Sequence, residues 1–201
     1  MKISNLKTYL FASLSIGLLS SCVNDDDTVL PEYTPLIFGE NFNAGVDNTL
    51  LEIEGWKNYA QAGTALWKTQ IYSGNGYAEF TSFQSNNASN IGWLISPSIN
   101  LDAQEGEKFV FQASQSYVDN VANTLEVLIS QDYDGTNVEA ATWQNLTATL
   151  PTTTSVYFAF INSGVIDLSQ FTGDVHLAFR VKGNGTTLDG SYQIDNVRVY
   201  N

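Results

Sequence analysis

Apolar and polar residues alternate with a period of two in several short segments of this chain of 201 residues. The clearest alternation runs through Val175, Leu177, Phe179 and Val181, each followed by a polar or small residue. This period is typical of strands that bury one face and expose the other. Because no segment has a convincing helical period, the pattern predicts an all-β protein. Similar alternation occurs at 77–83, 109–111, 125–129 and 158–160.

Turn signals rich in Gly, Asn and Ser separate the alternating segments. Clusters of this kind mark the places where strands end and the chain reverses direction. Their spacing predicts about nine to eleven strands in one domain, which indicates a two-sheet β-sandwich with jelly-roll topology. The signals lie at residues 73–76, 85–87, 134–135, 162–164 and 183–185.

The last predicted strand changes its phase partway along. Tyr192 and Ile194 share one parity, whereas Val197 lies on the other, and the switch falls at Asp195-Asn196. A one-residue β-bulge would produce this switch, and bulges redirect side chains near functional positions. Asp195 could therefore be a metal ligand held at a kink, or an acidic residue facing solvent at an irregular strand end.

The first 21 residues have the features of a secretory signal. Lys2 and Lys7 precede an apolar stretch at 9–19, which is about half of the ~20 residues that a membrane-spanning helix needs. Cys22 follows two small residues and is the only cysteine. The run 19–22 resembles a bacterial lipobox, which implies cleavage before Cys22 and lipidation of its thiol. The alternative is a secreted protein with a free thiol.

An acidic run at 25–27 follows the cysteine directly. It is similar to the export signal of Bacteroidetes-type surface lipoproteins, and this implies a lipid anchor in the outer membrane with the protein facing the cell exterior. A solvated polar tether is the alternative. Residues 22–35 are predicted to be an acidic linker, and 36–201 the β-domain.

The charge of the chain limits its partners. The net charge is −13, and removal of residues 1–21 would leave −15, because two lysines and no acidic residues would be lost. Such a surface repels nucleic acid and anionic membranes. Neutral sugars, cations and basic proteins remain compatible with it. With one cysteine, no intrachain disulfide can form.

The sequence offers no catalytic residues. His176 is the only histidine, and the polar phase of its strand predicts a solvated ring. A Ser–His–acid site would depend on it, yet no Gly-x-Ser-x-Gly elbow occurs. A histidine-rich zinc site is excluded for the same reason. Acidic residues are plentiful, but no motif selects a catalytic pair, so the chain is predicted not to be an enzyme.

A series of short motifs resembles the choice-of-anchor J domain, which is related to the cleaved-adhesin domains of bacterial surface proteins. The resemblance covers about residues 36–200. It implies a β-jelly roll similar to carbohydrate-binding modules, and it implies binding or adhesion rather than catalysis. The motifs are FGENF at 38–42, GW at 55–56, GNGYA at 74–78, GWLISPSINL at 92–101, LEVLIS at 125–130, YDG at 133–135, ATW at 141–143, IDLS at 166–169, AFR at 178–180 and QIDNV at 193–197.

The resemblance also implies a structural Ca²⁺ where the first and last strands meet. Calcium takes six to eight oxygen ligands, some of them backbone carbonyls. Glu40 in the opening motif and Asp195 in the closing motif are the predicted ligands, and Asn41 could add an oxygen.

Aromatic residues beside polar loops are candidates for ligand binding, because sugar-binding sheets use rings as stacking platforms. Trp67 and Tyr72 precede a Gly-Asn-Gly loop, and Tyr117 has the sequence context of a loop tip. Each of the three could instead be a core residue or incidentally exposed. Two functions remain open: a surface module that binds glycans, and a subunit that docks to a protein in a surface complex.

Overall fold

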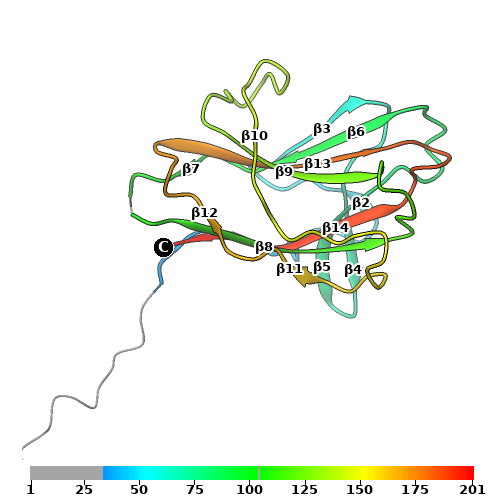
Figure 1. Ribbon diagram of the computed structural model, residues 1–201, viewed down its shortest axis with the longest axis horizontal. Helices are drawn as coiled ribbons and strands as arrows, with labels where there is room; N and C mark the ends of the chain where they lie inside the picture. Colours follow the sequence, from blue (N-terminus) through cyan, green and yellow to red (C-terminus); the bar gives the residue numbers. More distant parts are fainter. Residues whose placement is uncertain (1–33, 104) are drawn as a thin grey trace, which may run out of the picture. The chain divides into compact units, whose positions relative to one another are not determined.

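Two antiparallel β-sheets lie face to face in the computed structural model, which describes residues 34–103 and 105–201 (Figure 1). The β-sandwich with jelly-roll topology predicted from the sequence is confirmed. The described residues form strands, turns and irregular segments, and they contain no helix that is long and apolar enough to cross a membrane. The predicted signal peptide, Cys22 and the acidic run lie outside the described residues.

One sheet, called sheet A, has the order β11-β8-β14-β5-β4-β2, with β1 also beside β14 and β12 also beside β8. The strands β14 and β8 lie at its centre. The strands of sheet A are β1 Leu36–Glu40, β2 Thr49–Leu50, β4 Lys68–Tyr72, β5 Asn75–Thr81, β8 Lys108–Ser116, β11 Ile161–Asn162, β12 Ile166–Asp167 and β14 Ser191–Tyr200.

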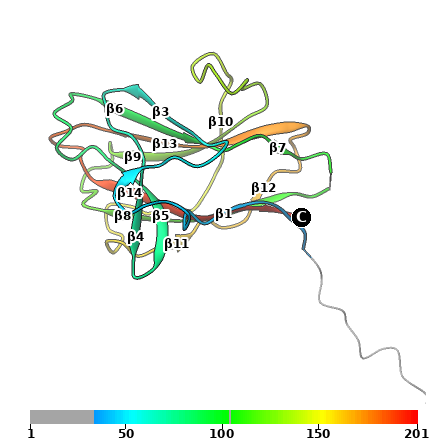
Figure 2. The same ribbon diagram turned by 180° about the vertical axis from the view of Figure 1, so that it is seen from behind.

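The other sheet, called sheet B, has the order β10-β9-β13-β6-β3, with β7 also beside β13. Figure 2 shows both layers from behind, with the connection from β2 to β3 crossing between them. The strands of sheet B are β3 Lys57–Ala62, β6 Asn90–Ile95, β7 Ile99–Asn100, β9 Thr124–Ser130, β10 Gln144–Asn145 and β13 Asp174–Gly183.

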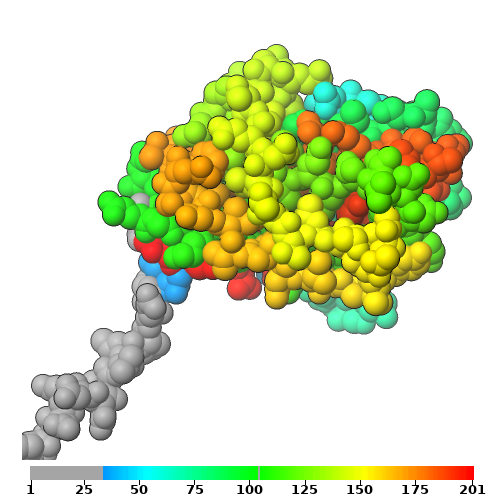
Figure 3. Space-filling view, viewed as in Figure 1, coloured from blue at the N-terminus to red at the C-terminus, as the bar shows by residue number. Residues whose placement is uncertain are grey.

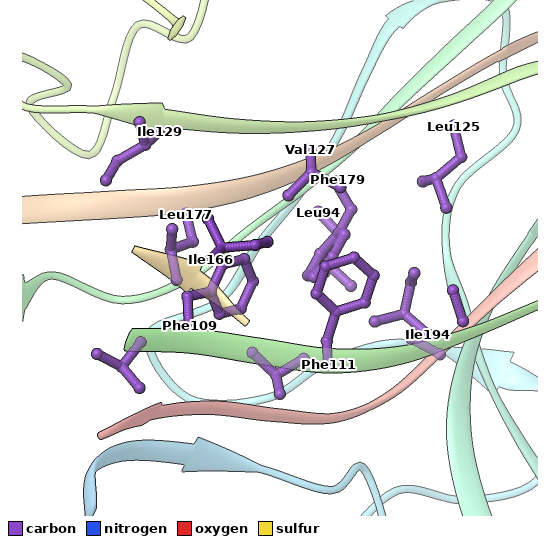
Figure 4. Packing of buried hydrophobic residues seen from close by; sticks show 14 of the residues in the cluster. Leu94, Phe109, Phe111, Leu125, Val127, Ile129, Ile166, Leu177, Phe179 and Ile194 are labelled. Carbon is purple, nitrogen blue, oxygen red and sulfur yellow. The ribbon is translucent and has the colours of Figure 1, made fainter. Parts of the chain in front are cut away.

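The core lies between the sheets and consists of the residues that alternate along each strand. Phe109 and Phe111 of β8 point toward Leu177 and Phe179 of β13 (Figure 4). Phe111 and Phe179 meet edge to face, with ring centroids 5.0 Å apart. Burial of rings of this size is the main apolar contribution to stability in a domain without disulfides.

The phase switch in the last strand is a β-bulge, as the sequence predicts. The register of β14 against β8 shifts between Asp195 and Arg198. Before the bulge, β14 pairs with β5, and after it, β14 pairs with β1. The bulge therefore lies where the first and last strands of the domain come together.

The strand predicted at 158–160 is an irregular segment instead. Phe158 has φ at 58°, which breaks an extended conformation, and β11 begins only at Ile161. The preceding segment leaves β10 in sheet B and reaches β11 in sheet A, so it crosses one open side of the sandwich (Figure 1). Local alternation could not reveal this crossing, because the segment follows a path set by tertiary contacts.

Trp67 is one of the three rings that the sequence offers as ligand-binding candidates, and this candidate is wrong, because Trp67 is fully buried, as the alternative core reading has it. It shares the inward phase of Thr69 on β4, and its ring packs against Phe80 with centroids 5.6 Å apart. Asn58 holds the Trp67 backbone through two hydrogen bonds of 2.8 and 3.0 Å. Trp67 therefore belongs to the core.

We expect Trp67→Ala to lower the free energy of unfolding by about 3–5 kcal/mol, because it removes a large buried ring and leaves a cavity. Tyr117→Ala removes an exposed ring and is the matched control, with an expected loss of at most about 1.5 kcal/mol from its ring contact. Urea unfolding, followed by far-ultraviolet circular dichroism, measures the free energy of unfolding of both variants. Equal losses for the two variants would contradict the burial of Trp67.

Candidate functional site

The outer face of sheet A carries a row of buried polar side chains. By register, Gln193 of β14 lies between Ser114 of β8 and Glu79 of β5. Ser114 Oγ donates to Gln193 Oε1 over 2.7 Å, and Gln193 Nε2 donates to Glu79 Oε2 over 2.8 Å. The row continues through Ser116, which receives a longer bond from Gln193 Nε2 and donates to Ser191. Because hydrogen bonds connect these side chains along the row, the row is a rigid floor.

Two aromatic rings lie over this floor from opposite sides of β14. Tyr77 of β5 and Phe160, the residue before β11, meet edge to face with centroids 5.6 Å apart. Burial raises the pKa of Tyr77 above its usual value, and the charge of Glu79 raises it further. Asp47 and Tyr72 add smaller contributions in the same direction. Tyr72 pairs with Asn75, two residues before Tyr77, so its side chain lies on the same face of sheet A.

A second aromatic pair lies at the end of the sheet where β8 stops. Tyr117 in the loop after β8 packs against Tyr157 in the loop before β11, with centroids 4.8 Å apart. Gln115 ties the same two loops together. Its Oε1 accepts a bond of 3.0 Å from Val118 N, and its Nε2 donates to Ser155 O over 2.7 Å.

The backbone of this end adopts an unusual conformation. Tyr117 and Phe158 both have φ at 58°, in the left-handed region that bulky residues rarely enter. Conformations of this kind persist where surrounding contacts enforce them, and they cluster at functional sites. Here the Gln115 hydrogen bonds and the Tyr117–Tyr157 contact provide that enforcement.

Together these rings form a surface that we call the aromatic arc. Phe158 links the two pairs along the chain, and its ring is exposed. The crossing segment that brings Tyr157, Phe158 and Phe160 to sheet A is yellow on the near face in Figure 3. The aromatic arc consists of Tyr72, Tyr77, Tyr117, Tyr157, Phe158 and Phe160.

Two of the three rings proposed from the sequence belong to the arc. Tyr72 is 75 % exposed and Tyr117 is 66 % exposed, whereas Trp67 is in the core. Sequence reasoning missed the other four rings of the arc. The aromatic cluster at 157–160 is a visible signal in the sequence, but its alternation indicates a strand with a core face.

The outer face of sheet B differs because the chain itself covers it. Trp93 of β6 is buried there beneath Trp143, with centroids 5.2 Å apart, and Tyr133 packs on Trp143. The guanidinium of Arg180 lies 4.8 Å from the Trp93 ring and pairs with Glu126. The rings on the outer face of sheet B are therefore packed in a second hydrophobic cluster. Those of the arc on sheet A are more exposed.

The predicted calcium ligands lie near the β14 bulge. Glu40 and Asn41 line a pocket of about 730 Å³ together with Asn196, the neighbour of Asp195. Asp195 does not line this pocket. Its Oδ2 accepts a bond of 2.9 Å from Asn75, and its Oδ1 accepts one of 2.6 Å from Asn196 N.

One observation fits a bound cation at this place. Asp195 is only 2 % exposed, and it forms no salt bridge with the described residues. Burial raises the pKa of its carboxyl, against the effects of Asn75, Asn196 and Arg198. A buried carboxylate without a cationic partner is costly. No group of three or more His, Cys, Asp or Glu side chains in the described part of the chain could hold a metal ion. Calcium would therefore need neutral oxygen ligands too.

His176 is not the solvated side chain that the sequence predicts. Its Nδ1 lies 2.8 Å from Ser96 O, and its ring meets Tyr133 edge to face. These contacts fix the ring at the boundary of the cluster on sheet B. The histidine therefore contributes to packing.

Solved structures with a similar fold include two domains of one bacterial protein. The K1 cleaved adhesin domain of Lys-gingipain from Porphyromonas gingivalis W83 has a TM-score of 0.50 and 18 % identity, with 81 % of this chain and 96 % of that chain covered. The K3 cleaved adhesin domain has a TM-score of 0.50 and 17 % identity, with coverage of 83 % and 100 %. At this identity the likeness shows a shared fold alone.

No curated protein matches the sequence. A family does match it, however, and it does so over residues 70–201, which include the arc and the β14 bulge. That match spans more than half of the chain. The chain therefore belongs to the family described as "Domain of unknown function (DUF5017)".

Proposed function

We propose that this protein is a non-catalytic module that binds glycans at the aromatic arc. The observation that carries the proposal is the exposed Tyr117–Tyr157 pair at the end of a face whose floor is polar and hydrogen-bonded. Sugar rings present apolar C–H faces that stack on aromatic rings, and hydroxyl groups that need polar partners. The arc offers the rings, and the half-buried Glu79 beside it offers a polar acceptor on the same side of sheet A.

Docking to a surface protein is the second candidate function. The arc contains exposed rings without a deep cleft, and such a surface also suits a protein interface. The cleaved adhesin domains that share this fold are adhesive by name, which favours binding over catalysis in either case. We favour glycans because the half-buried charge of Glu79 lies beside the rings, whereas the cores of protein interfaces are depleted of charged residues.

We expect Tyr157→Ala to weaken glycan binding at least several-fold while the domain stays folded, because the ring is exposed and leaves no cavity. Stacking on an open face typically gives dissociation constants from micromolar to millimolar. Glycan-array screening of residues 34–201, followed by calorimetric titration, measures the affinity. Tyr117→Ala should behave in the same way.

Val165→Ala is the matched control, since Val165 is a well-exposed apolar residue outside the arc. Its affinity should equal that of the wild type. If the wild-type domain bound no glycan in a broad panel but captured a protein through the same two tyrosines, the docking function would replace the proposal.

We also propose that Glu40, Asn41 and Asp195 contribute to a structural calcium site. The support is the buried carboxylate of Asp195, which forms no salt bridge within the described residues and lies beside the junction of β1 and β14. A bound cation would supply the positive charge that Asp195 lacks. It would thereby stabilise the pairing of the first and last strands.

We expect calcium to raise the melting temperature, because a ligand that binds only the folded state adds about 2.7 kcal/mol at a 100-fold excess over its dissociation constant. For a domain of this size that is roughly 5–10 °C. Asp195→Asn should remove most of the response to calcium, whereas Asp119→Asn, an exposed control, should keep it. The same melting temperature with chelator and with calcium would refute the site.

We further propose that the protein is a lipoprotein of the outer membrane that faces the cell exterior. The support is the sequence around Cys22, with its apolar stretch before and its acidic run after. More than one acyl chain gives stable anchoring, which a single chain does not. A surface location would also give a glycan-binding module access to its ligands.

We expect Cys22→Ala to abolish membrane anchoring, because it removes the thiol that would carry the lipid. Fractionation with antibody detection measures this. Protease added to intact cells should degrade the wild-type protein, while a periplasmic marker stays intact. Full protection of the wild type would show that the acidic run is not an export signal.

A further inference from the structure

The side chain of Glu79 lies on the outer face of sheet A, next to the aromatic arc. It lies on β5 two residues after Tyr77, so both side chains are on the same face of the strand. Its cross-strand neighbours are Gln193 on β14 and Lys68 on β4. It therefore forms the β5 end of the polar floor and lies beside Tyr77, whose ring meets Phe160.

The carboxylate of Glu79 is held in one orientation but keeps a free acceptor. Its Oε2 accepts the bond of 2.8 Å from Gln193 Nε2, and Gln193 is itself fully buried and fixed by Ser114. Within the described residues, Oε1 of Glu79 has no hydrogen-bond partner. Lys68 does not neutralise the charge by a salt bridge, and its Nζ donates to Asn48 instead.

Negative charge acts on the Tyr77 ring of the arc. Both Glu79 and Asp47 act on Tyr77 so as to raise its pKa, which is the effect of negative charge near a phenol. Burial raises the pKa of Glu79 as well, while Gln193 and Lys68 oppose the shift. A half-buried carboxylate accepts hydroxyl donors well and repels a second anion.

We propose that Glu79 makes the aromatic arc selective for neutral, hydroxyl-rich polysaccharides and excludes those that carry uronate or sulfate groups. This inference rests on the proposed glycan-binding function. Rings stack on the sugar face, and the fixed Oε1 accepts a hydroxyl of the same sugar. An acidic sugar in that position would place two anions side by side, and Glu79 has no salt bridge within the described residues to offset their repulsion.

The test compares binding to neutral and acidic polymers. The neutral probes are dextran, galactomannan, xylan and yeast mannan, and the acidic probes are polygalacturonate and chondroitin sulfate. Affinity electrophoresis and calorimetry measure binding. The wild-type domain should bind at least one neutral probe and neither acidic probe.

Glu79→Gln keeps the shape of the side chain and an acceptor oxygen but removes the charge. We expect it to weaken binding of the neutral probe about tenfold, because a hydrogen bond to a charged group is lost, and to allow detectable binding of an acidic probe. Glu79→Asp keeps the charge but withdraws it from Gln193. It should weaken neutral binding while acidic probes remain excluded.

Glu139→Gln is the matched control. It changes the net charge by the same amount, but Glu139 lies on the sheet B side, where it accepts a bond from Tyr59. It should leave both kinds of binding unchanged. If Glu139→Gln matched Glu79→Gln, the effect would come from overall charge and the inference would be overturned.

Three further outcomes distinguish a failure of the selectivity from a failure of glycan binding itself. Wild-type binding to neutral and acidic probes alike would overturn the selectivity while leaving glycan binding intact. Neutral binding that is unaffected by Glu79→Gln would do the same. A folded wild-type domain that binds no probe of either kind would overturn both.

Discussion

The pairing of β14 with three other strands is the constraint on which the rest of this domain depends. It lies against β8 along its length, against β5 before the bulge, and against β1 after it. At the bulge, residues 195–198, β14 exchanges β5 for β1 as its neighbour while it stays paired with β8. The bulge also switches which residues of β14 face the core. The same strand therefore closes the sandwich, carries Gln193 into the floor of the arc and buries Asp195.

The two sheets use their outer faces in different ways. On sheet B, the excursion between β9 and β10 folds back and covers Trp93 with Trp143, so the outer face becomes a second small core. On sheet A, the segment before β11 brings its rings to the edge of a polar floor and leaves them exposed. A sandwich has two outer faces available for binding, and this chain has filled one of them with its own side chains.

The sequence predicts most of the fold because burial on one face imposes a period of two. It predicts the bulge for the same reason, since a change of partner shows as a change of parity. It does not predict which outward-facing residues the chain will cover, because that depends on segments that cross between sheets. Trp67 and Phe158 show two other limits of a local pattern. Polar neighbours made Trp67 look exposed although its phase points inward, and alternation around Phe158 suggested a strand although a left-handed residue ends it.

The candidate site could be predicted in part for a related reason. Tyr72 and Tyr117 are found from sequence because each lies beside a turn signal, where exposure is expected. Tyr157, the partner of Tyr117, comes from the crossing segment, and Tyr77 meets Phe160 of the same segment, so only the tertiary fold brings these rings together. The role of Glu79 likewise depends on Gln193, which is 114 residues away along the chain.

The domain begins and ends at the same place. Leu36 pairs with Tyr200, Asn201 N donates to Pro35 O over 3.2 Å, and this end lies opposite the end of β8 that carries Tyr117. A pull between residue 34 and a ligand held at the arc would run along the strand axes, over the roughly 27 Å that nine residues of β8 span. It would load the hydrogen bonds between β1 and β14 all at once in shear, instead of opening them one by one. The strand order thus gives the domain a direction in which it resists force best.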